Sequence, residues 1–313
     1  IMYSKMYLTD IESGEAFLGF NKNKNETPFT ILGIPLDMSS SFRGGCGIAP
    51  RRIRFVSRSL ELCSIMTGID VESIGFEDVG DVVLSPGDMQ SSLKRIEYVV
   101  RELLKDKDRI LIAIGGEHTI TLPIFKSLAS ERSQCLVVLD AHADLRDEYL
   151  GSRYNHATVI RRTIEETKSR IILIGARALS REEIEAYHQL KEYITIIRVW
   201  QGNIHSNIEK ELLHELESCS RLHISIDMDI LDPTYAPGVQ TPEPLGLDPA
   251  TLLKILSLVA NNRVRVIDLV EVSPIYDQSD VTSFLAAKII IELTATIYKN
   301  IYGDRAEKYM CRI

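Results

Sequence analysis

Blocks of apolar residues and blocks of mixed polarity alternate along the chain. Short runs rich in Val, Ile and Leu, with little charge, are typical of buried parallel strands. They occur at residues 29–35, 74–79, 109–114, 135–139, 171–175, 193–199, 221–226 and 264–270. Elsewhere, apolar residues recur at helical spacing, which predicts amphipathic helices. These helices cover residues 50–67, 88–104, 123–128, 156–167, 207–217, 249–260 and 281–302, and Ser180 opens another with Glu183 in capping position.

This alternation predicts an α/β fold: a mostly parallel sheet of about eight strands with helices on both faces. Candidate functional residues are spread from His118 to Asp229, on several strands. Such residues can share one site only if their strands belong to one sheet. We therefore expect a single-domain three-layer sandwich over residues 29–313. Residues 1–28 end in a polar tract at 21–26, which indicates an N-terminal arm before the core.

Charge and cysteine content restrict the partners and the setting. The net charge of −8 and the pI near 5.5 argue against a nucleic-acid partner and modestly favour a cationic small substrate. The five cysteines are widely spaced and include no CxxC pair, so we expect no disulfide framework and a reducing, cytoplasmic setting. Cys135 is expected to be an inert thiol in the core. Residues 1–19 are too charged for a signal peptide. The sequence contains no run of about eighteen apolar residues, so we expect no membrane span.

Histidines and carboxylates follow the predicted strands. Asp140-Ala141-His142-Ala143-Asp144 comes directly after the apolar run 135–139, and residues 140, 142 and 144 point the same way if the chain stays extended. Asp227 and Asp229 repeat this spacing after another strand, and His118 and Glu271 follow two more. Because open α/β sheets carry their sites at the carboxyl ends of their strands, these groups are expected to converge there.

The resulting ligand set favours two metal ions over one. The candidate ligands are His118, Asp140, His142, Asp144, Asp227 and Asp229. Six ligands exceed the three that a catalytic zinc normally takes from the protein. The set is rich in oxygen, contains imidazole and lacks thiolate, so manganese is preferred over zinc or copper. Two such ions can activate a shared water at neutral pH.

The same segments resemble the signatures of the ureohydrolase family, which includes arginase, agmatinase, guanidinobutyrase and formiminoglutamase. The resemblance rests on Gly115-Gly116-Glu117-His118, Asp140–Asp144, Ser225–Asp229, Ser41-Phe42-Arg43 and Glu271-Val272-Ser273-Pro274, and it covers roughly residues 30–300. The chain is most similar to agmatinase through Asn155-His156-Ala157-Thr158, Gln240-Thr241-Pro242-Glu243 and Asp268–Glu271. The resemblance implies the arginase-like form of the three-layer sandwich, assembled as homotrimers or hexamers.

The resemblance also implies a mechanism and a role for each residue. A guanidino group is hydrolysed by attack of a metal-bridging hydroxide between two Mn²⁺ ions, releasing urea and an amine. One ion takes His118, Asp140, Asp144 and Asp227; the other takes His142, Asp140, Asp227 and Asp229. Asp229 also passes a proton to the leaving amine, Glu271 holds the guanidinium, and His156 shuttles protons. As alternatives to these roles, Glu271 could form a structural ion pair and His156 could anchor its helix. His223 is expected to be a core residue or to support a ligand.

The substrate's tail is less constrained by the sequence. In the loop 145–154, Asp147 and Glu148 favour a cationic tail, which points to agmatine, cleaved to putrescine and urea, or to aminopropylagmatine. Arg146 and Arg153 could instead serve an anionic tail such as that of guanidinobutyrate, and arginine is a further alternative. Two other classes are kept as alternatives: a metal-binding relative without turnover, and a deacetylase that uses a single zinc.

Overall fold

The computed structural model describes residues 7–128, 133–199 and 206–311. Its centre is a sheet of eight strands in the order β2-β1-β3-β8-β7-β4-β5-β6, and every pair is parallel. This confirms the predicted α/β sandwich. The strands are β1 (Phe29–Ile34), β2 (Glu77–Asp81), β3 (Ile110–Gly115), β4 (Gln134–Leu139), β5 (Arg170–Ile174), β6 (Ile194–Ile197), β7 (Arg221–Asp227) and β8 (Val264–Val270).

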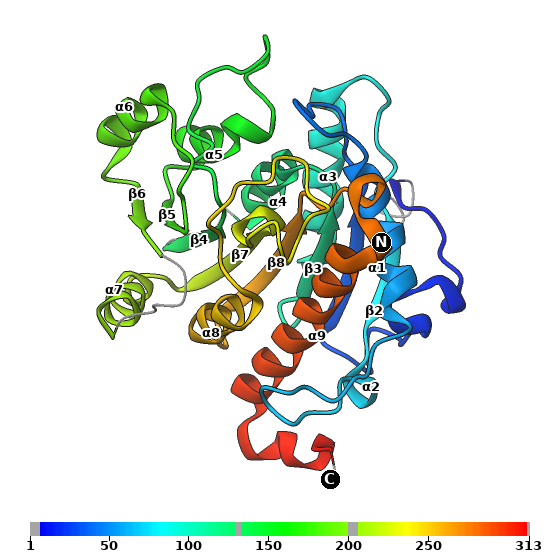
Figure 1. Ribbon diagram of the computed structural model, residues 1–313. Helices are drawn as coiled ribbons and strands as arrows, with labels where there is room; N and C mark the ends of the chain where they lie inside the picture. Colours follow the sequence, from blue (N-terminus) through cyan, green and yellow to red (C-terminus); the bar gives the residue numbers. More distant parts are fainter. Residues whose placement is uncertain (1–6, 129–132, 200–205, 312–313) are drawn as a thin grey trace.

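Helices cover both faces of this sheet (Figure 1). On one face lie α1 (Ala49–Ser57), α2 (Val71–Ile74), α7 (Ser206–Glu217), α8 (Pro249–Val259) and α9 (Val281–Tyr302). On the other lie α3 (Met89–Leu103), α4 (Thr121–Leu128), α5 (Val159–Thr167) and α6 (Arg181–Leu190). The central strands β3, β4, β7 and β8 are buried along almost their whole length, which explains their nearly uninterrupted apolar sequences.

Two helix boundaries differ from the sequence-based prediction by more than two residues. The helix expected over 50–67 ends at Ser57, because the backbone beyond it closes its own loop: Ser64 N donates to Ile69 O and Val71 N to Leu62 O. The helix expected from His156 begins with a 3-10 turn, His156–Thr158, and continues as α5. Asn155 caps that turn through a capping box with Thr158, which fixes the backbone where His156 sits.

The segment before β1 packs against the domain. Phe17 is fully buried, and its backbone N–H donates to the Asp78 carboxylate at 2.9 Å. The ring of Phe17 meets Phe76 edge-to-face with 5.1 Å between centroids. The described part of the predicted arm is therefore held by the core next to α1 and β2.

The cysteine prediction was wrong. Cys135 on β4 forms a disulfide with Cys219, which lies just before β7, and Cys63 is paired with Cys311 near the C-terminal end of the chain. Cys46 is the free, buried cysteine among the described residues. Spacing gave no signal for these bonds, because their partners are 84 and 248 residues apart and meet only through the sheet and α9. Cys135 is therefore a structural cross-link and not a core thiol.

The long helical stretch at the C-terminal end is unusually apolar. By length and composition alone, Gln278–Tyr309 would suffice to cross a membrane, and it is the one such stretch in the described chain. However, 78% of its most apolar window is buried inside the protein, where α9 packs on α1 and α8. Such burial is what the core helix of a globular fold shows.

Candidate metal centre

The six predicted ligands all lie at the carboxyl ends of neighbouring strands. His118 follows β3, Asp140 follows β4, and Asp227 is the last residue of β7. Parallel pairing of β4 with β7 and of β7 with β8 aligns these ends on one rim. Gly116 lets the backbone pass close to Leu36, since a Cβ atom on it would lie 1.9 Å from the Leu36 carbonyl oxygen. The rim thus follows from the topology of the sheet.

The first half of the site is built around His118, which is buried. Its Nδ1 atom lies 3.1 Å from Asp140 Oδ2, 3.0 Å from Asp144 Oδ2 and 3.5 Å from Asp227 Oδ2. Asp144 takes a left-handed backbone conformation, with φ of 50°, which costs energy for a residue other than glycine. Strain of this kind persists where the surrounding structure requires one side-chain direction, and here it directs a carboxylate at the His118 ring.

The second half is built around His142, on the cavity side of the rim. Its Nδ1 atom lies 2.8 Å from Asp229 Oδ2 and 3.7 Å from Asp140 Oδ1. The other oxygen of Asp229 accepts from the Ala141 N–H at 3.1 Å, and Asp227 Oδ1 accepts from the Asp229 N–H at 2.9 Å. Asp140 is common to both groups of side chains that lie close enough to hold an ion: His118, Asp140 and Asp144, and Asp140, His142 and Asp229.

These donor atoms suit divalent cations. His118 Nδ1 and Asp140 Oδ2 are buried and have no hydrogen-bond partner among the described residues. Burial and the neighbouring Asp140 raise the pKa of Asp144 to about 7. Burial, Asp229 and Asp140 raise the pKa of Asp227 as well. The carboxylates thus repel one another, and bound cations would neutralise this excess of negative charge.

Glu271, just past β8, borders the ligands. Burial raises the pKa of its carboxyl group, one oxygen of which accepts the backbone N–H of His118. Its other oxygen, Oε2, is buried without a partner among the described residues. The Glu271 backbone is also left-handed, with φ of 69°. Glu271 lines the cavity beside the ligands, and its unpaired carboxylate oxygen is a group to which a cationic N–H group could bind.

A family model described as the arginase family matches residues 27–295. The chain belongs to the arginase family. It is 33% identical over 300 residues to the agmatinase of Bacillus cereus, covering 92% of this chain and 98% of that protein. It is also 33% identical over 276 residues to the human mitochondrial guanidino acid hydrolase, covering 86% and 78% of the two chains. The solved structure of the agmatine ureohydrolase of Thermoplasma volcanium matches with a TM-score of 0.82 and 32% identity, covering 97% of this chain and 100% of that one.

Membership of the arginase family establishes the class of enzyme. The protein is a ureohydrolase of the agmatinase and arginase type, which confirms the resemblance read from the sequence. The family is one of binuclear metal enzymes, and the cluster of histidines and aspartates described above has the donors for two ions.

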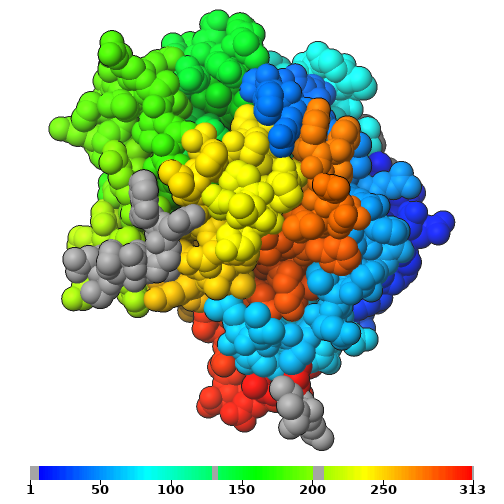
Figure 2. Space-filling model, viewed as in Figure 1, coloured from blue at the N-terminus to red at the C-terminus, as the bar shows by residue number. Residues whose placement is uncertain are grey.

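The cavity of this ureohydrolase has a volume of about 450 Å³. His118, His142, Asp144, Asp227 and Glu271 form its floor, and Arg146, Tyr149, His156, Glu183 and Thr241 are among the residues of its walls. Loops from distant parts of the sequence meet nearby: Ser273 Oγ donates to Gly44 O at 2.6 Å, and the corresponding blue and orange segments touch in Figure 2. The site is thus assembled from most of the length of the chain.

His156 lies in the cavity wall and is mostly buried. Its Nδ1 is 3.3 Å from Ser39 Oγ and its Nε2 is 3.1 Å from Ser41 Oγ. Burial and the positive charge of His118 and His142 in the metal-free protein lower its pKa to about 4. The imidazole is consequently neutral near pH 7 and able to accept a proton. The residue predicted to shuttle protons therefore lies at the cavity, held by Ser39, which the sequence did not single out, and by Ser41, which the sequence marked only as part of a signature segment.

Asp147 and Glu148 are not among the residues that line the cavity. Arg162 donates to Asp147 Oδ1 at 2.6 Å, and Arg153 and Arg161 lie within 3.1 Å and 3.7 Å of the same oxygen. Glu148 is exposed. The structure does not bring these two carboxylates to the metal centre, and the substrate contact expected of them stays a prediction. Glu183, which the sequence marked only as a helix cap, supplies a carboxylate to the cavity wall instead.

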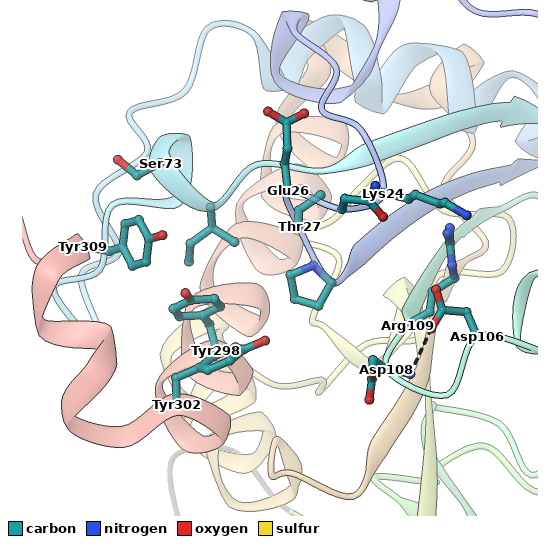
Figure 3. A pocket seen from close by; sticks show the side chains of 13 residues that line it. Lys24, Glu26, Thr27, Ser73, Asp106, Asp108, Arg109, Tyr298, Tyr302 and Tyr309 are labelled. Atoms are coloured by element: carbon teal, nitrogen blue, oxygen red, sulfur yellow. Dashed lines mark hydrogen bonds between the residues drawn. The ribbon is translucent and has the colours of Figure 1, made fainter.

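A second hollow lies near the amino ends of β1 and β3 (Figure 3). Tyr298, Tyr302 and Tyr309 form one wall, and Arg109 with Asp106 and Asp108 lies across from them. The described residues that line it include no histidine, and both aspartates are exposed. It contains none of the chemistry of the metal centre and lies at the other end of the strands.

Proposed function

We propose that the protein hydrolyses agmatine to putrescine and urea with two Mn²⁺ ions bound at the rim. The observation that carries this proposal is the cluster of five histidine and aspartate side chains joined by Asp227, with unpaired buried donor atoms, beside the unpaired oxygen of Glu271. Bound at these oxygen and imidazole donors, two manganese ions would lower the pKa of water and so supply a nucleophile at neutral pH.

The chain's own residues then position the substrate and handle protons. Glu271 Oε2 accepts N–H groups of the guanidinium, which orients its carbon toward the ligands. Asp229 Oδ2 lies 3.4 Å from Thr241 Oγ1, so a hydroxyl fixes its direction, and Asp229 would carry one proton from the attacking water to the leaving amine. His156, neutral near pH 7 and at the cavity wall, would relay the other proton of that water, by way of solvent, to the same amine, which leaves as an ammonium ion.

The charges of the cavity support a cationic substrate. Apart from the metal ligands, its lining contains the carboxylates of Glu183 and Glu271. Arg146 also lines it, but its guanidinium faces Glu182 at 3.3 Å, which offsets part of its charge. A protonated amine on the substrate's tail is therefore favoured over a carboxylate.

A guanidino acid is the second candidate. Arg146 is a cation in the cavity wall, and its pairing with Glu182 is partly exposed, so a carboxylate could compete for it. The identity to a guanidino acid hydrolase is as high as that to an agmatinase, so sequence similarity does not separate the two substrates. The expected trimer or hexamer and the cytoplasmic location stay predictions.

A substrate panel tests the proposal. Agmatine, aminopropylagmatine, arginine and guanidinobutyrate are offered to the manganese-loaded protein, and urea release is measured. We expect the highest kcat/KM for agmatine. A higher value for guanidinobutyrate would establish the guanidino acid reading, and the variant Arg146→Met should then lower that activity. Absence of urea from all four compounds would contradict the proposed reaction.

A further inference from the structure

Arg177 lies in the loop between β5 and α6, and its guanidinium donates to backbone carbonyl groups of two other segments. Its Nη2 atom donates to Asp229 O at 2.7 Å and to Glu243 O at 2.6 Å. Its Nη1 atom donates to Ile230 O at 3.2 Å, and its Nε atom donates to Pro244 O at 3.0 Å. A guanidinium suits such a set, because its N–H donors lie in one plane and point in several directions. One side chain thus joins the turn after β7 to a loop further along the chain.

Arg177 is also part of a ring of hydrogen bonds that holds Asp229 from two sides. The neighbouring Ala178 N–H and the N–H of Arg177 itself both donate to Ala141 O, at 2.9 Å and 2.8 Å. The Ala141 N–H donates to Asp229 Oδ1 at 3.1 Å. The guanidinium closes the ring at the backbone carbonyl of the same aspartate. Both the backbone and the carboxylate of Asp229 are therefore fixed relative to the loop of Arg177.

The carboxylate held in this way contacts two residues of the cavity lining. Asp229 Oδ2 lies 2.8 Å from His142 Nδ1 and 3.4 Å from Thr241 Oγ1. Thr241 belongs to the loop whose carbonyl groups bind Arg177. The guanidinium is therefore the common anchor of Asp229 and Thr241, which meet at one edge of the metal centre.

Gly246 leaves room for the guanidinium. A Cβ atom at this position would lie 2.7 Å from Arg177 Nη2. Burial lowers the pKa of Arg177, because the enclosed cation loses contact with water. Hydrogen bonds to the carbonyl groups offset part of that cost. The contacts that Arg177 makes must therefore account for its presence in this loop.

Arg263, just before β8, makes contacts of the same kind elsewhere. Its Nη1 atom donates to Leu216 O at 2.7 Å and to Cys219 O at 2.9 Å. Like Arg177 it is partly buried, but it lies at the amino ends of the strands, away from the metal centre. Arginines thus join backbone segments at two places in this protein. Arg177 differs from Arg263 because one of the segments that it joins carries a candidate metal ligand.

We propose that Arg177 is a positioning residue whose guanidinium sets the direction of the Asp229 carboxylate toward the ion that His142 and Asp229 would share. The inference rests on the two-metal centre of the proposed function and extends it to a residue outside the ligand set. Groups that orient metal ligands commonly change metal affinity by about 10–100-fold. The hydrogen bonds described for Arg177 include none to His118 or Asp144, so the other ion should be little affected.

The test measures manganese binding and stability, not only turnover. Arg177→Met removes the guanidinium and keeps a long side chain. Arg177→Lys keeps the positive charge, but a single ammonium group cannot reproduce the planar set of donors that spans both segments. Arg263→Met is the matched control. Each metal-free protein is titrated with Mn²⁺ against a competing fluorescent chelator, electron paramagnetic resonance distinguishes isolated ions from coupled pairs, and urea unfolding measures stability.

We expect a selective loss of metal affinity. Arg177→Met should weaken one of the two Mn²⁺-binding steps by about 10–100-fold, so that coupled pairs form only at higher metal concentration. The other step should stay within about threefold, which is under half the logarithmic effect expected for the first. Arg177→Lys should show the same selective loss. Arg263→Met should leave both steps within about threefold, although it too removes hydrogen bonds and lowers the free energy of unfolding.

A double variant tests whether Arg177 acts through Asp229. Asp229→Asn should weaken the same binding step by itself. If the guanidinium acts by orienting that carboxylate, adding Arg177→Met should weaken the step by less than about threefold further, because contributions that depend on each other are not additive. Effects of the two substitutions that multiply in full would show that Arg177 acts independently of Asp229, and this would overturn the proposal.

The outcomes separate this inference from the proposed function. Two steps that Arg177→Met leaves unchanged, or weakens equally, would overturn the positioning role while leaving the binuclear centre in place. Full affinity in Arg177→Lys would overturn it as well, since charge alone would then suffice. Failure of the unaltered protein to bind two ions would instead contradict the centre itself, and absence of urea release from a protein that binds two ions would contradict only the proposed reaction. If Arg177→Met does not fold, Arg177→Lys decides, because the inference requires the selective loss in that variant too.

Discussion

Two buried clusters of charged side chains differ in how their charge is neutralised. At Arg54, on α1, the guanidinium donates to both oxygens of Asp78 at 2.8 Å and 2.9 Å and also to Asp81. The N–H groups of Phe17 and Gly80 complete the shell of Asp78. At the metal centre, by contrast, the carboxylates of Asp140, Asp144 and Asp227 lie close together around His118. Asp140 Oδ2 has no hydrogen-bond partner there, and no arginine or lysine is among the described residues that contact these carboxylates.

The contrast separates structural charge from functional charge. The buried Arg54–Asp78 pair is neutral and fully hydrogen-bonded, and Asp81 beside it is partly exposed, so this cluster can be buried as part of the fold. The rim holds an excess of negative charge that the protein itself does not neutralise, and it is held by strained backbone at Asp144 and Glu271. A site left unbalanced in this way has its counter-charge supplied by ligands. The following predictions alter each cluster in turn.

The largest effect is expected at the unbalanced cluster. Asp227→Asn removes a ligand expected to bridge both ions, so kcat/KM for the best guanidino substrate should fall by roughly 10³-fold or more, several kcal/mol of transition-state stabilisation. Because the pKa of Asp227 is raised, its charge opposes folding of the metal-free protein. Urea unfolding of the metal-free variant at pH 8 should therefore show equal or greater stability, and a clear loss would contradict this account.

The opposite result is expected at the balanced cluster. Arg54→Met leaves Asp78 buried without its partner, so the free energy of unfolding should fall by about 3–5 kcal/mol, while kcat of the folded fraction is unchanged. Unfolding in urea measures the loss. The double variant Arg54→Met with Asp78→Asn removes the orphaned charge and should recover part of it. A loss below about 1 kcal/mol, the scale of an exposed pair, would show that this cluster is not structural.

The fold and the gathering of the candidate ligands at one rim could be predicted because their signals are local in the sequence. Each buried strand is a separate apolar run, and each ligand follows such a run directly, as Asp140 follows 135–139. Parallel strands then bring their ends together whatever the order of the sheet. The assignment of the ligands needed only the type and position of a residue, not its neighbours in space.

Features that depend on three-dimensional neighbours escaped the sequence. The Cys135–Cys219 disulfide forms because β4 and β7 are adjacent, and no spacing rule encodes that adjacency. Asp147 looked available for a substrate, but Arg162 comes from α5 to bind it. Ser39 and Ser41 reach His156 across 117 and 115 residues. The sequence of a loop shows that it contains a carboxylate, but it does not show which side chain that carboxylate will bind in the folded protein.

Metal binding should stabilise the folded protein through the metal centre and should not depend on the Arg54 cluster. At a free Mn²⁺ concentration 100 times the dissociation constant, a site bound only in the folded state adds about 2.7 kcal/mol to the free energy of unfolding. Urea unfolding with and without chelator measures this increment. It should be retained in Arg54→Met and lost or greatly reduced in Asp227→Asn. An increment that survives in Asp227→Asn would mean that the ions bind elsewhere.

The remaining prediction concerns His156, at the edge of the unbalanced cluster, and its pH dependence has a defined sign. Its folded pKa of about 4 lies below the ordinary value of 6.5, so between these pH values the unfolded chain takes up a proton that the folded protein refuses. Folding stability contributed by this group therefore rises with pH across that window and levels off above it, by up to about 3 kcal/mol. The variant His156→Gln should lose this pH dependence, seen as a stability difference from the unaltered protein that changes between pH 4 and 6.5. His214→Gln, on an exposed helix surface, is the control for loss of an imidazole. A difference that stays constant with pH would show that His156 takes up its proton as readily when folded as when unfolded, which would contradict the lowered pKa described for it.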